Sequence, residues 1–234
     1  MGLAMQYGAA TLAMVESAVA DGVDHAVLLM RHSAREFEPG RHDLENPLTE
    51  AGRELARQFG ERLPKQLLAR AYASPAERCV ETAELVLAGH AAGGGRVTRQ
   101  RPIEALGVFY VLDQMRMYRA MTDATGQAPF LARWFAGEIP DDVMMPADLA
   151  ARMLMRLVAA KLDAPVARPQ LDVCESHDMS LYLVRDRLLD LGVETAGEVK
   201  FLDAVMCYRR DGRLYVDAPG REARPLDLDS YTRR

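Results

Sequence analysis

The sequence predicts an α/β protein of three layers, in which helices cover both faces of a mostly parallel central sheet. After residue 25, short continuous apolar segments, the pattern of strands buried on both faces, alternate with segments of helical periodicity. This alternation is typical of βα units rather than of helical bundles or β-sandwiches. The chain has 234 residues, of which 49% are hydrophobic and 27% charged, and this is sufficient for one full core. We therefore expect a single domain over residues 1–234.

The first half of the chain is expected to supply an N-terminal helix and the first βα units. Thr49 is a suitable N-cap residue, because its hydroxyl can accept a hydrogen bond from the first turn of a helix that ends before Pro64. Pro75 is suited to the start of a second helix, since its ring fixes a helical φ angle. A glycine run at residues 93–95 indicates a turn into a further strand. The expected elements are a helical extension within residues 1–22, strands at residues 25–30, 67–73 and 96–101, and helices after Thr49 and Ser74.

A long segment in the second half, residues 105–162, is mostly helical in pattern and rich in methionine and aromatic residues. We interpret it as a helical cap inserted over the sheet. A later helix is expected to end at Gly192, and the dipeptide Asp211-Gly212 is typical of a β-hairpin turn. The expected elements here are a strand at residues 171–174, a helix at residues 179–191, and hairpin strands at residues 201–209 and 213–217.

Composition and charge exclude several classes of function. The formal net charge of −5 does not favour nucleic acid or anionic membranes as partners, because both require a dominant basic surface. No segment approaches the about 18 consecutive apolar residues of a membrane span, and residues 1–22 lack the basic start of a secretory signal. The three cysteines are widely spaced and form no CxxC pair, so neither disulfides nor a cysteine zinc site is expected. A reducing cytoplasm fits this pattern best.

Histidine and arginine residues follow the ends of two predicted strands. Arg31 and His32 follow the apolar run of the first strand, and His177 follows that of the strand after the cap. Arg78 falls in the first turn of the helix that Pro75 starts. The carboxyl ends of parallel strands meet at one edge of a sheet, where open α/β sheets bind their ligands. We therefore expect these side chains to meet, and the grouping indicates phosphoryl chemistry on a nucleophilic histidine.

Four short motifs occur in order along the chain. They are Arg31-His32, the stretch from Pro47 to Gly52, the stretch from Ser74 to Arg78 with Glu81 to Ala83 after it, and Ser176-His177-Asp178. Each is weak alone, but the four in this order are specific. With them the sequence resembles the histidine phosphatase superfamily, whose members have the phosphoglycerate mutase-like fold. The resemblance covers about residues 25–210 and implies the three-layer architecture expected above.

The resemblance implies roles for these residues. His32 would be the nucleophile that becomes phosphorylated, while Arg31, Arg78 and His177 would hold the phosphoryl oxygens. Phosphoryl transfer requires alignment and neutralisation of charge, and forked guanidinium groups provide both. Nearby arginines also oppose protonation of the imidazole, which must be neutral to attack. Arg35 matches a further phosphate-binding arginine of the acid-phosphatase branch.

Two carboxylic acids compete for the role of proton donor to the leaving alkoxide. In the acid-phosphatase branch of the resembled family, the donor directly follows the second histidine, which corresponds to Asp178. In the phosphoglycerate mutase branch it is a glutamate after the third strand, which corresponds to Glu104. We favour Asp178 because the His-Asp pair is intact, whereas the sequence after Glu104 departs from the mutase pattern. Whichever residue acts must carry a proton near the leaving oxygen.

The resemblance thus predicts a metal-independent phosphomonoester hydrolase that acts on a phosphorylated small molecule. No cofactor or metal is expected, because the arginines around His32 and His177 would repel a cation. A phosphoglycerate mutase-type phosphotransferase is an alternative within the same chemistry. A second alternative is a catalytically weak regulatory module that binds a phosphorylated ligand. It depends on Ser33, which stands where the family has glycine and would narrow the pocket or change the loop.

Overall fold

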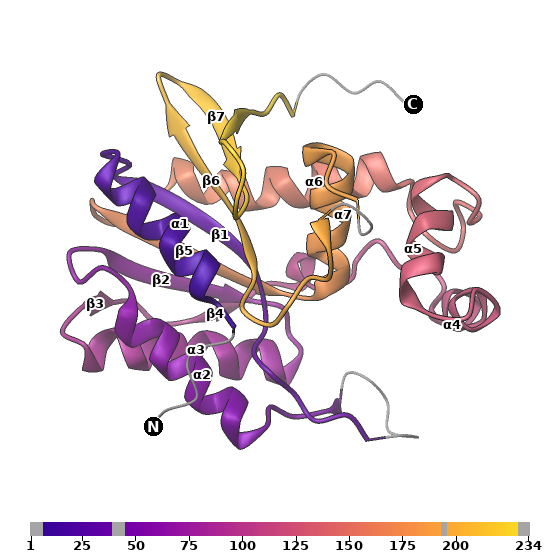
Figure 1. Ribbon diagram of the computed structural model, residues 1–234, viewed down its shortest axis with the longest axis horizontal. Coiled ribbons are helices and arrows are strands. Elements are labelled where there is room, and N and C mark those ends of the chain that lie inside the picture. Colours follow the sequence, from indigo (N-terminus) through magenta and orange to yellow (C-terminus); the bar gives the residue numbers. More distant parts are fainter. Residues whose placement is uncertain (1–6, 39–44, 193–195, 229–234) are drawn as a thin grey trace.

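A mostly parallel sheet forms the centre of the protein (Figure 1). The structure is a computed structural model in which residues 7–38, 45–192 and 196–228 are described. Its strands are β1 (His25–Arg31), β2 (Leu68–Ala73), β3 (Arg96–Val97), β4 (Arg101–Pro102), β5 (Gln170–Ser176), β6 (Ala204–Arg210), β7 (Arg213–Asp217) and β8 (Arg224–Pro225). They lie in the order β3-β2-β5-β1-β6-β7-β8, and β4 also pairs with β2. Strands β1 to β5 pair in parallel with one another, and β6 to β8 add antiparallel strands at one edge.

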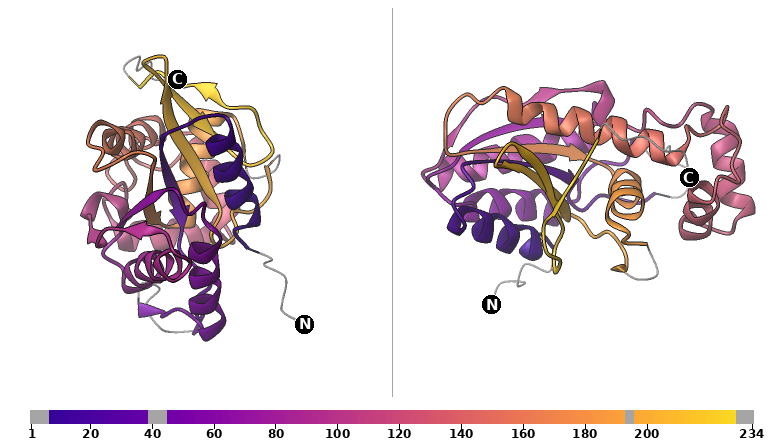
Figure 2. Two further views of the ribbon diagram at one scale, coloured as in Figure 1. Left: turned by 90° about the vertical axis from the view of Figure 1, so that its left-hand side faces the viewer. Right: turned by 90° about the horizontal axis from the view of Figure 1, so that it is seen from above.

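Helices cover both faces of the sheet. They are α1 (Ala9–Ala20), α2 (Glu50–Arg62), α3 (Glu77–Ala92), α4 (Gln114–Asp123), α5 (Gln127–Phe135), α6 (Ala147–Ala159) and α7 (Asp178–Leu189), with short 3₁₀ helices η2 (Glu104–Leu106) and η3 (Ala160–Asp163). Helices α1 to α3 pack on one face, and α6 and α7 pack on the other (Figures 1 and 2). The three-layer α/β prediction is therefore confirmed. Among the described helices, none combines the length and apolar character that crossing a bilayer requires.

The central strand β1 explains why its sequence is a continuous apolar run. Successive side chains of a strand point to opposite faces. Leu28 and Met30 pack with the helices α1 to α3, whereas Val27 and Leu29 pack with the α6 and α7 layer. All four side chains are fully buried, so both faces of this part of the strand lie in apolar surroundings.

Most of the other expected elements are present at nearly the expected bounds. Helix α2 follows Thr49, whose hydroxyl accepts a hydrogen bond from the first turn at 2.9 Å. The hairpin of β6 and β7 turns at Asp211 and Gly212, both with positive φ angles. Helix α7 ends at Leu189, earlier than predicted, because Asp190 adopts the left-handed conformation that ends a helix. Helix α1 lies within the expected N-terminal extension, of which residues 1–6 are outside the described part.

The prediction of one strand at residues 96–101 is wrong, because the structure has two short strands there, β3 and β4. Both pair with β2. Val97 pairs with Ala69 and Arg101 pairs with Tyr72. The segment from Val97 to Arg101 is therefore one residue longer than the segment from Ala69 to Tyr72 beside which it lies. A continuous ladder cannot absorb the additional residue, and the pairing is interrupted.

The expected helical cap, residues 105–162, divides into two parts. Helix α6 lies along the sheet, whereas α4 and α5 project beyond it at the right of Figure 1. At the base of this projection, the rings of Tyr110 and Trp134 stack with centroids 5.2 Å apart. The Tyr110 hydroxyl lies 3.0 Å from Ser180 Oγ, which in turn lies 3.0 Å from Ser176 Oγ. Hydrogen bonds therefore join the base of the cap to the carboxyl end of β5.

Candidate active site

The structure brings His32 and His177 together. Their strands, β1 and β5, are neighbours in a parallel register that pairs Arg31 with Ser176, so the residue after each strand emerges at the same edge of the sheet. The two imidazole rings are 5.8 Å apart between centroids, at an interplanar angle of 73°. Both residues are buried, with only 2% and 6% of their surface exposed.

The surroundings of His32 leave one ring nitrogen as a hydrogen-bond acceptor. Nδ1 lies 2.8 Å from the carbonyl oxygen of Ser33, which can only accept a hydrogen bond, so Nδ1 carries the proton. Nε2 then has a free electron pair, to which Arg78 Nε donates at 3.0 Å. Burial, and next the positive charge of Arg78, hold the pKa of His32 well below its ordinary value. His32 is therefore a neutral imidazole at neutral pH, which is the form that can attack phosphorus.

Arg78 joins the two histidines. It lies in the first turn of α3 and is 2% exposed. Its Nη2 atom is 3.4 Å from His177 Nδ1, while His177 Nε2 is 2.9 Å from Ser74 Oγ. The Arg78 guanidinium is thus in contact with both imidazoles, and that of His32 is neutral. We call the group of His32, Arg78, His177 and Ser74 the histidine cup.

Cys79 also borders the histidine cup. Its Sγ atom lies 3.9 Å from His177 Nε2 and 3.6 Å from the carbonyl oxygen of Ser176. Burial strongly raises the pKa of this thiol. Cys79 is therefore a thiol rather than a thiolate, and it is a free cysteine like Cys174 and Cys207.

Arg31 and Asp178 form the rim beside the cup. An Arg31 Nη atom lies 3.1 Å from Asp178 Oδ2, and another donates to the carbonyl oxygen of Val199 at 2.5 Å. The Arg31 guanidinium also lies over the ring of Phe201, 4.2 Å from its centroid. Arg31 is close enough to His32 to contribute to its lowered pKa. The first candidate proton donor is thus ion-paired to one of the predicted phosphate ligands.

Glu104, the second candidate donor, lies at the start of η2 and is exposed. Its segment lies close to the cup: a Cβ atom at Gly107 would be 3.1 Å from the carbonyl oxygen of Glu104 and 3.6 Å from Ser74 Oγ. The end of η2 is held by Ser176, whose hydroxyl donates to the carbonyl oxygen of Leu106 at 2.7 Å. Both candidate acids therefore belong to segments that border the same site.

Arg35 and Ser33 lie on the loop that follows β1. The Arg35 guanidinium donates to the carbonyl oxygen of Glu36 at 3.0 Å and lies 5.8 Å from the Phe37 ring centroid, so these contacts are within its own loop. Phosphate binding by Arg35 stays a prediction. The Ser33 side chain is buried and donates to the carbonyl oxygen of Gly52 at 2.7 Å. It is therefore directed toward α2, where it fastens the loop.

Three features of the site were not found from the sequence. The sequence predicts that Phe201 starts a strand, but the residue lies in the loop before β6, with its ring centroid 6.0 Å from that of His32. Ser74 belongs to a predicted helix start and to one of the four motifs, but the sequence gives no sign of its contact with His177. Glu175 lies in β5 directly before the Ser-His-Asp motif and is completely buried. A charged residue within a fully buried strand was the available signal for Glu175.

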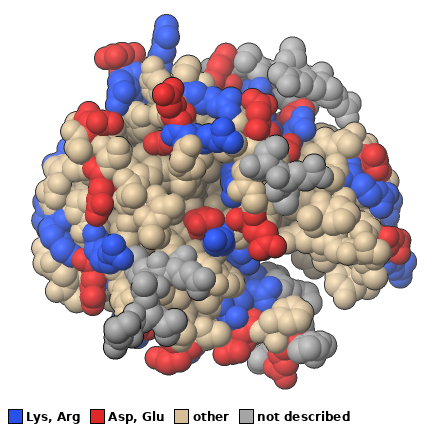
Figure 3. All heavy atoms as spheres, in the orientation of Figure 1, with Lys and Arg blue, Asp and Glu red and all other residues tan. Residues whose placement is uncertain are grey.

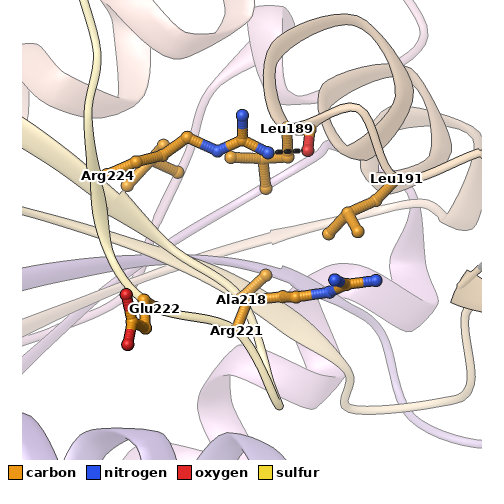
Figure 4. A pocket seen from close by; sticks show the side chains of 7 residues that line it. Leu189, Leu191, Ala218, Arg221, Glu222 and Arg224 are labelled. Atoms are coloured by element: carbon orange, nitrogen blue, oxygen red, sulfur yellow. Dashed lines mark hydrogen bonds between the residues drawn. The ribbon is translucent and has the colours of Figure 1, made fainter.

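The surface near this edge is indented. Figure 3, in the orientation of Figure 1, shows a notch between the projecting part formed by α4 and α5 and the rest of the molecule. A second hollow, of about 190 Å³, lies elsewhere, at the C-terminal end of α7 (Figure 4). Since α7 has twelve residues, this hollow is about 18 Å along the helix from His177. Its lining residues are Leu189, Leu191, Val216, Ala218, Arg221, Glu222 and Arg224.

Comparison with known families agrees with the geometry of the cup. A family model described as histidine phosphatase superfamily (branch 1) matches residues 27–145, which include His32 and Arg78. The chain belongs to the histidine phosphatase superfamily. The matched residues end before His177 and Asp178, whose inclusion in the site rests on the structure. No curated protein sequence matches the chain.

Solved structures of the superfamily share this fold at low sequence identity. A phosphoserine phosphatase mutant from Entamoeba histolytica has a TM-score of 0.53 and 14% identity, and the alignment covers 84% of this chain and 97% of that one. A phosphoglycerate mutase from Bacillus anthracis has a TM-score of 0.52 and 18% identity, over 85% and 94% of the two chains. A mycobacterial glucosyl-3-phosphoglycerate phosphatase has 0.53 and 19%, over 82% and 97%. At these identities the similarity establishes the phosphoglycerate mutase-like fold.

Proposed function

We propose that the protein is a phosphomonoester hydrolase that forms a phosphohistidine on His32. The observation that carries this proposal is the state of that imidazole: it is neutral, and the electron pair of Nε2 faces the guanidinium of Arg78 at 3.0 Å. Membership of the histidine phosphatase superfamily supports the same chemistry. A phosphorylated small molecule is the proposed substrate class.

In the first step, the phosphoryl group enters the histidine cup and its oxygens accept the hydrogen bonds that Arg78 otherwise gives to the imidazoles. This transfer frees Nε2 of His32, which attacks phosphorus. The bond from phosphorus to the ester oxygen breaks, and the leaving alkoxide receives a proton from a carboxylic acid. The N-terminal end of α3, where Arg78 lies, adds a favourable field for the anion.

We propose Asp178 as the acid, with Glu104 as the alternative. Asp178 is paired with Arg31 at 3.1 Å. A bound phosphoryl group competes with Asp178 for the Arg31 guanidinium, and this competition would free the carboxyl group to approach the leaving oxygen. In the second step, water attacks the phosphohistidine and gives its proton to the same carboxylate, which restores the acid. Inorganic phosphate and free His32 result.

Replacement of the nucleophile tests the proposal. His32→Ala should retain the circular dichroism spectrum of the wild type but lose turnover of p-nitrophenyl phosphate and the acid-labile phosphoenzyme that the wild type forms with it. Arg221→Ala, in the hollow remote from the cup, serves as a matched control and should keep normal turnover. Turnover by His32→Ala at the wild-type rate would exclude His32 as the nucleophile.

The two alternative activities differ in their products. A mutase would return isomerised phosphoglycerate rather than free phosphate, and a binding module would hold a phosphorylated ligand without releasing phosphate. The second alternative depended on Ser33, but its hydroxyl is bonded to the carbonyl oxygen of Gly52 on the side of α2, so that substitution gives it little support. Release of inorganic phosphate from a panel of phosphomonoesters would favour the hydrolase.

A further inference from the structure

Glu175 is a fully buried residue of β5, two residues before His177. In the sheet, Glu175 of β5 is flanked by Met30 of β1 and Ala73 of β2, and all three residues are completely buried. Two residues further along β1 and β5 the chain reaches His32 and His177, and residues two apart in a strand face the same side of a sheet. Glu175 therefore lies on the same side of the sheet as His32 and His177, one step before them along the strands.

Within the described part of the chain, nothing pairs with the carboxyl group of Glu175. Both of its oxygens are buried and form no hydrogen bond with any described residue. Burial alone raises the pKa of Glu175 well above its ordinary value. The carboxyl group is therefore an uncharged acid at neutral pH, unlike Asp172 of the same strand, which is paired with Arg70 at 2.6 Å.

The polar groups that face this side of β5 come from few elements. Helix α3 contributes the Arg78 cation and the Cys79 thiol, and the segments after β1 and β5 contribute the imidazoles of His32 and His177. The neighbouring strands contribute apolar side chains in this row. The buried residues of α1 and α2 are uncharged; they are Thr11, Leu12, Met14, Val15 and Ala18 in α1, and Gly52, Ala56, Phe59 and Gly60 in α2.

We propose that the protonation state of Glu175 controls phosphate binding in the histidine cup. The uncharged acid leaves the positive field of the cup intact, and loss of its proton weakens phosphate binding. This inference rests on the proposed function, because it requires that the cup binds phosphate. An ionised Glu175 would repel the anion, and this repulsion would lower turnover at alkaline pH. Two like charges at a separation on the order of 10 Å, in an effective dielectric constant of about 20, repel strongly enough for at least a tenfold loss of phosphate affinity.

The test compares inorganic phosphate binding to the wild type and to Glu175→Gln by calorimetry from mildly acidic to alkaline pH. Glutamine has the same shape but cannot ionise. The wild type should lose at least about tenfold in affinity as the pH rises, whereas Glu175→Gln should retain its affinity. Glu175→Met provides a second uncharged variant, and Glu222→Gln, in the remote hollow, should behave as the wild type. The infrared carbonyl band of a protonated carboxyl group, absent from Glu175→Gln, reports the titration of Glu175 directly.

The outcomes separate the two proposals. If phosphate fails to bind the wild type at every pH, the proposed function and this inference are both wrong. If the wild type and Glu175→Gln both bind phosphate and both lose affinity to the same extent as the pH rises, only the role of Glu175 is refuted. If Glu175 had only a structural role, its variants would differ in melting temperature, but the pH at which phosphate affinity falls would be the same as in the wild type.

Discussion

Arg78 is the residue whose replacement should be most informative, because it contacts both imidazoles of the histidine cup. Its Nε and Nη2 atoms lie 3.0 Å from His32 Nε2 and 3.4 Å from His177 Nδ1. In the proposed substrate complex, these donors would bind two phosphoryl oxygens instead. Lysine keeps the positive charge but presents a single donor group, so Arg78→Lys loses about one charge-assisted hydrogen bond. Arg78→Ala loses both donors and the charge.

The magnitude follows from the number of bonds lost. One charge-assisted hydrogen bond is worth about 1.5–3 kcal/mol, so Arg78→Lys should reduce kcat/KM about 10- to 100-fold and Arg78→Ala about 10²- to 10⁴-fold. The two variants should also differ in pH dependence. Arg78 is the second largest cause of the lowered pKa of His32, so Arg78→Ala should raise the acid limit of activity and Arg78→Lys should leave it nearly unchanged.

The assay is kcat/KM for p-nitrophenyl phosphate across pH, with the affinity for inorganic phosphate as an independent measure. Arg221→Lys, a substitution of the same kind outside the cup, controls for general effects of losing a guanidinium group. If Arg78→Lys stays within about threefold of the wild type, the second hydrogen bond of the guanidinium fork does not stabilise the transition state.

Three further predictions concern other residues of the site. The lowered pKa of His32 keeps its imidazole neutral below the ordinary histidine value of 6.5, so activity should persist below that pH. The unfolded chain binds a proton on this imidazole more readily than the folded protein does, so the free energy of unfolding should decrease as the pH falls below 6.5. His32→Asn should flatten this part of the stability profile. An unchanged profile would contradict the assignment. Asp178→Asn should lower kcat for an alkyl phosphate about 10²- to 10³-fold, with a smaller effect on p-nitrophenyl phosphate, and Glu104→Gln should not; the reverse pattern would identify Glu104 as the acid. Ser33→Gly removes the hydrogen bond to Gly52 and adds backbone freedom, so urea denaturation should show a loss of about 1–2 kcal/mol, and a gain in stability would refute a fastening role.

Much of the site could be predicted from the sequence because strand ends are marked by composition. The apolar run of β1 stops at Arg31 and His32, and that of β5 stops at the Ser-His-Asp motif, so the meeting of His32 and His177 follows from two parallel neighbours. Arg78 could be placed because α3 follows β2 directly, so its first turn lies at the same edge of the sheet as the ends of the strands. These predictions needed only local patterns and the general rule for parallel sheets.

The remaining contacts depend on distant segments that carry no local signal. Arg31 and His32 are consecutive in an extended chain, and side chains of consecutive residues point to opposite sides. Arg31 therefore forms a hydrogen bond with Val199 and an ion pair with Asp178, whereas His32 accepts a hydrogen bond from Arg78. The split between β3 and β4 likewise depends on register with β2, which is a property of the pair of strands and not of either sequence.

The state of Cys79 has a practical consequence. A sulfur atom 3.9 Å from His177 Nε2 would compete with the imidazole for an electrophile if it were ionised, but the pKa of this thiol is strongly raised and the residue is fully buried. Cys79 therefore does not compete with His32, the proposed nucleophile. Iodoacetamide should leave the native protein active, and storage in air without a reducing agent should not inactivate it.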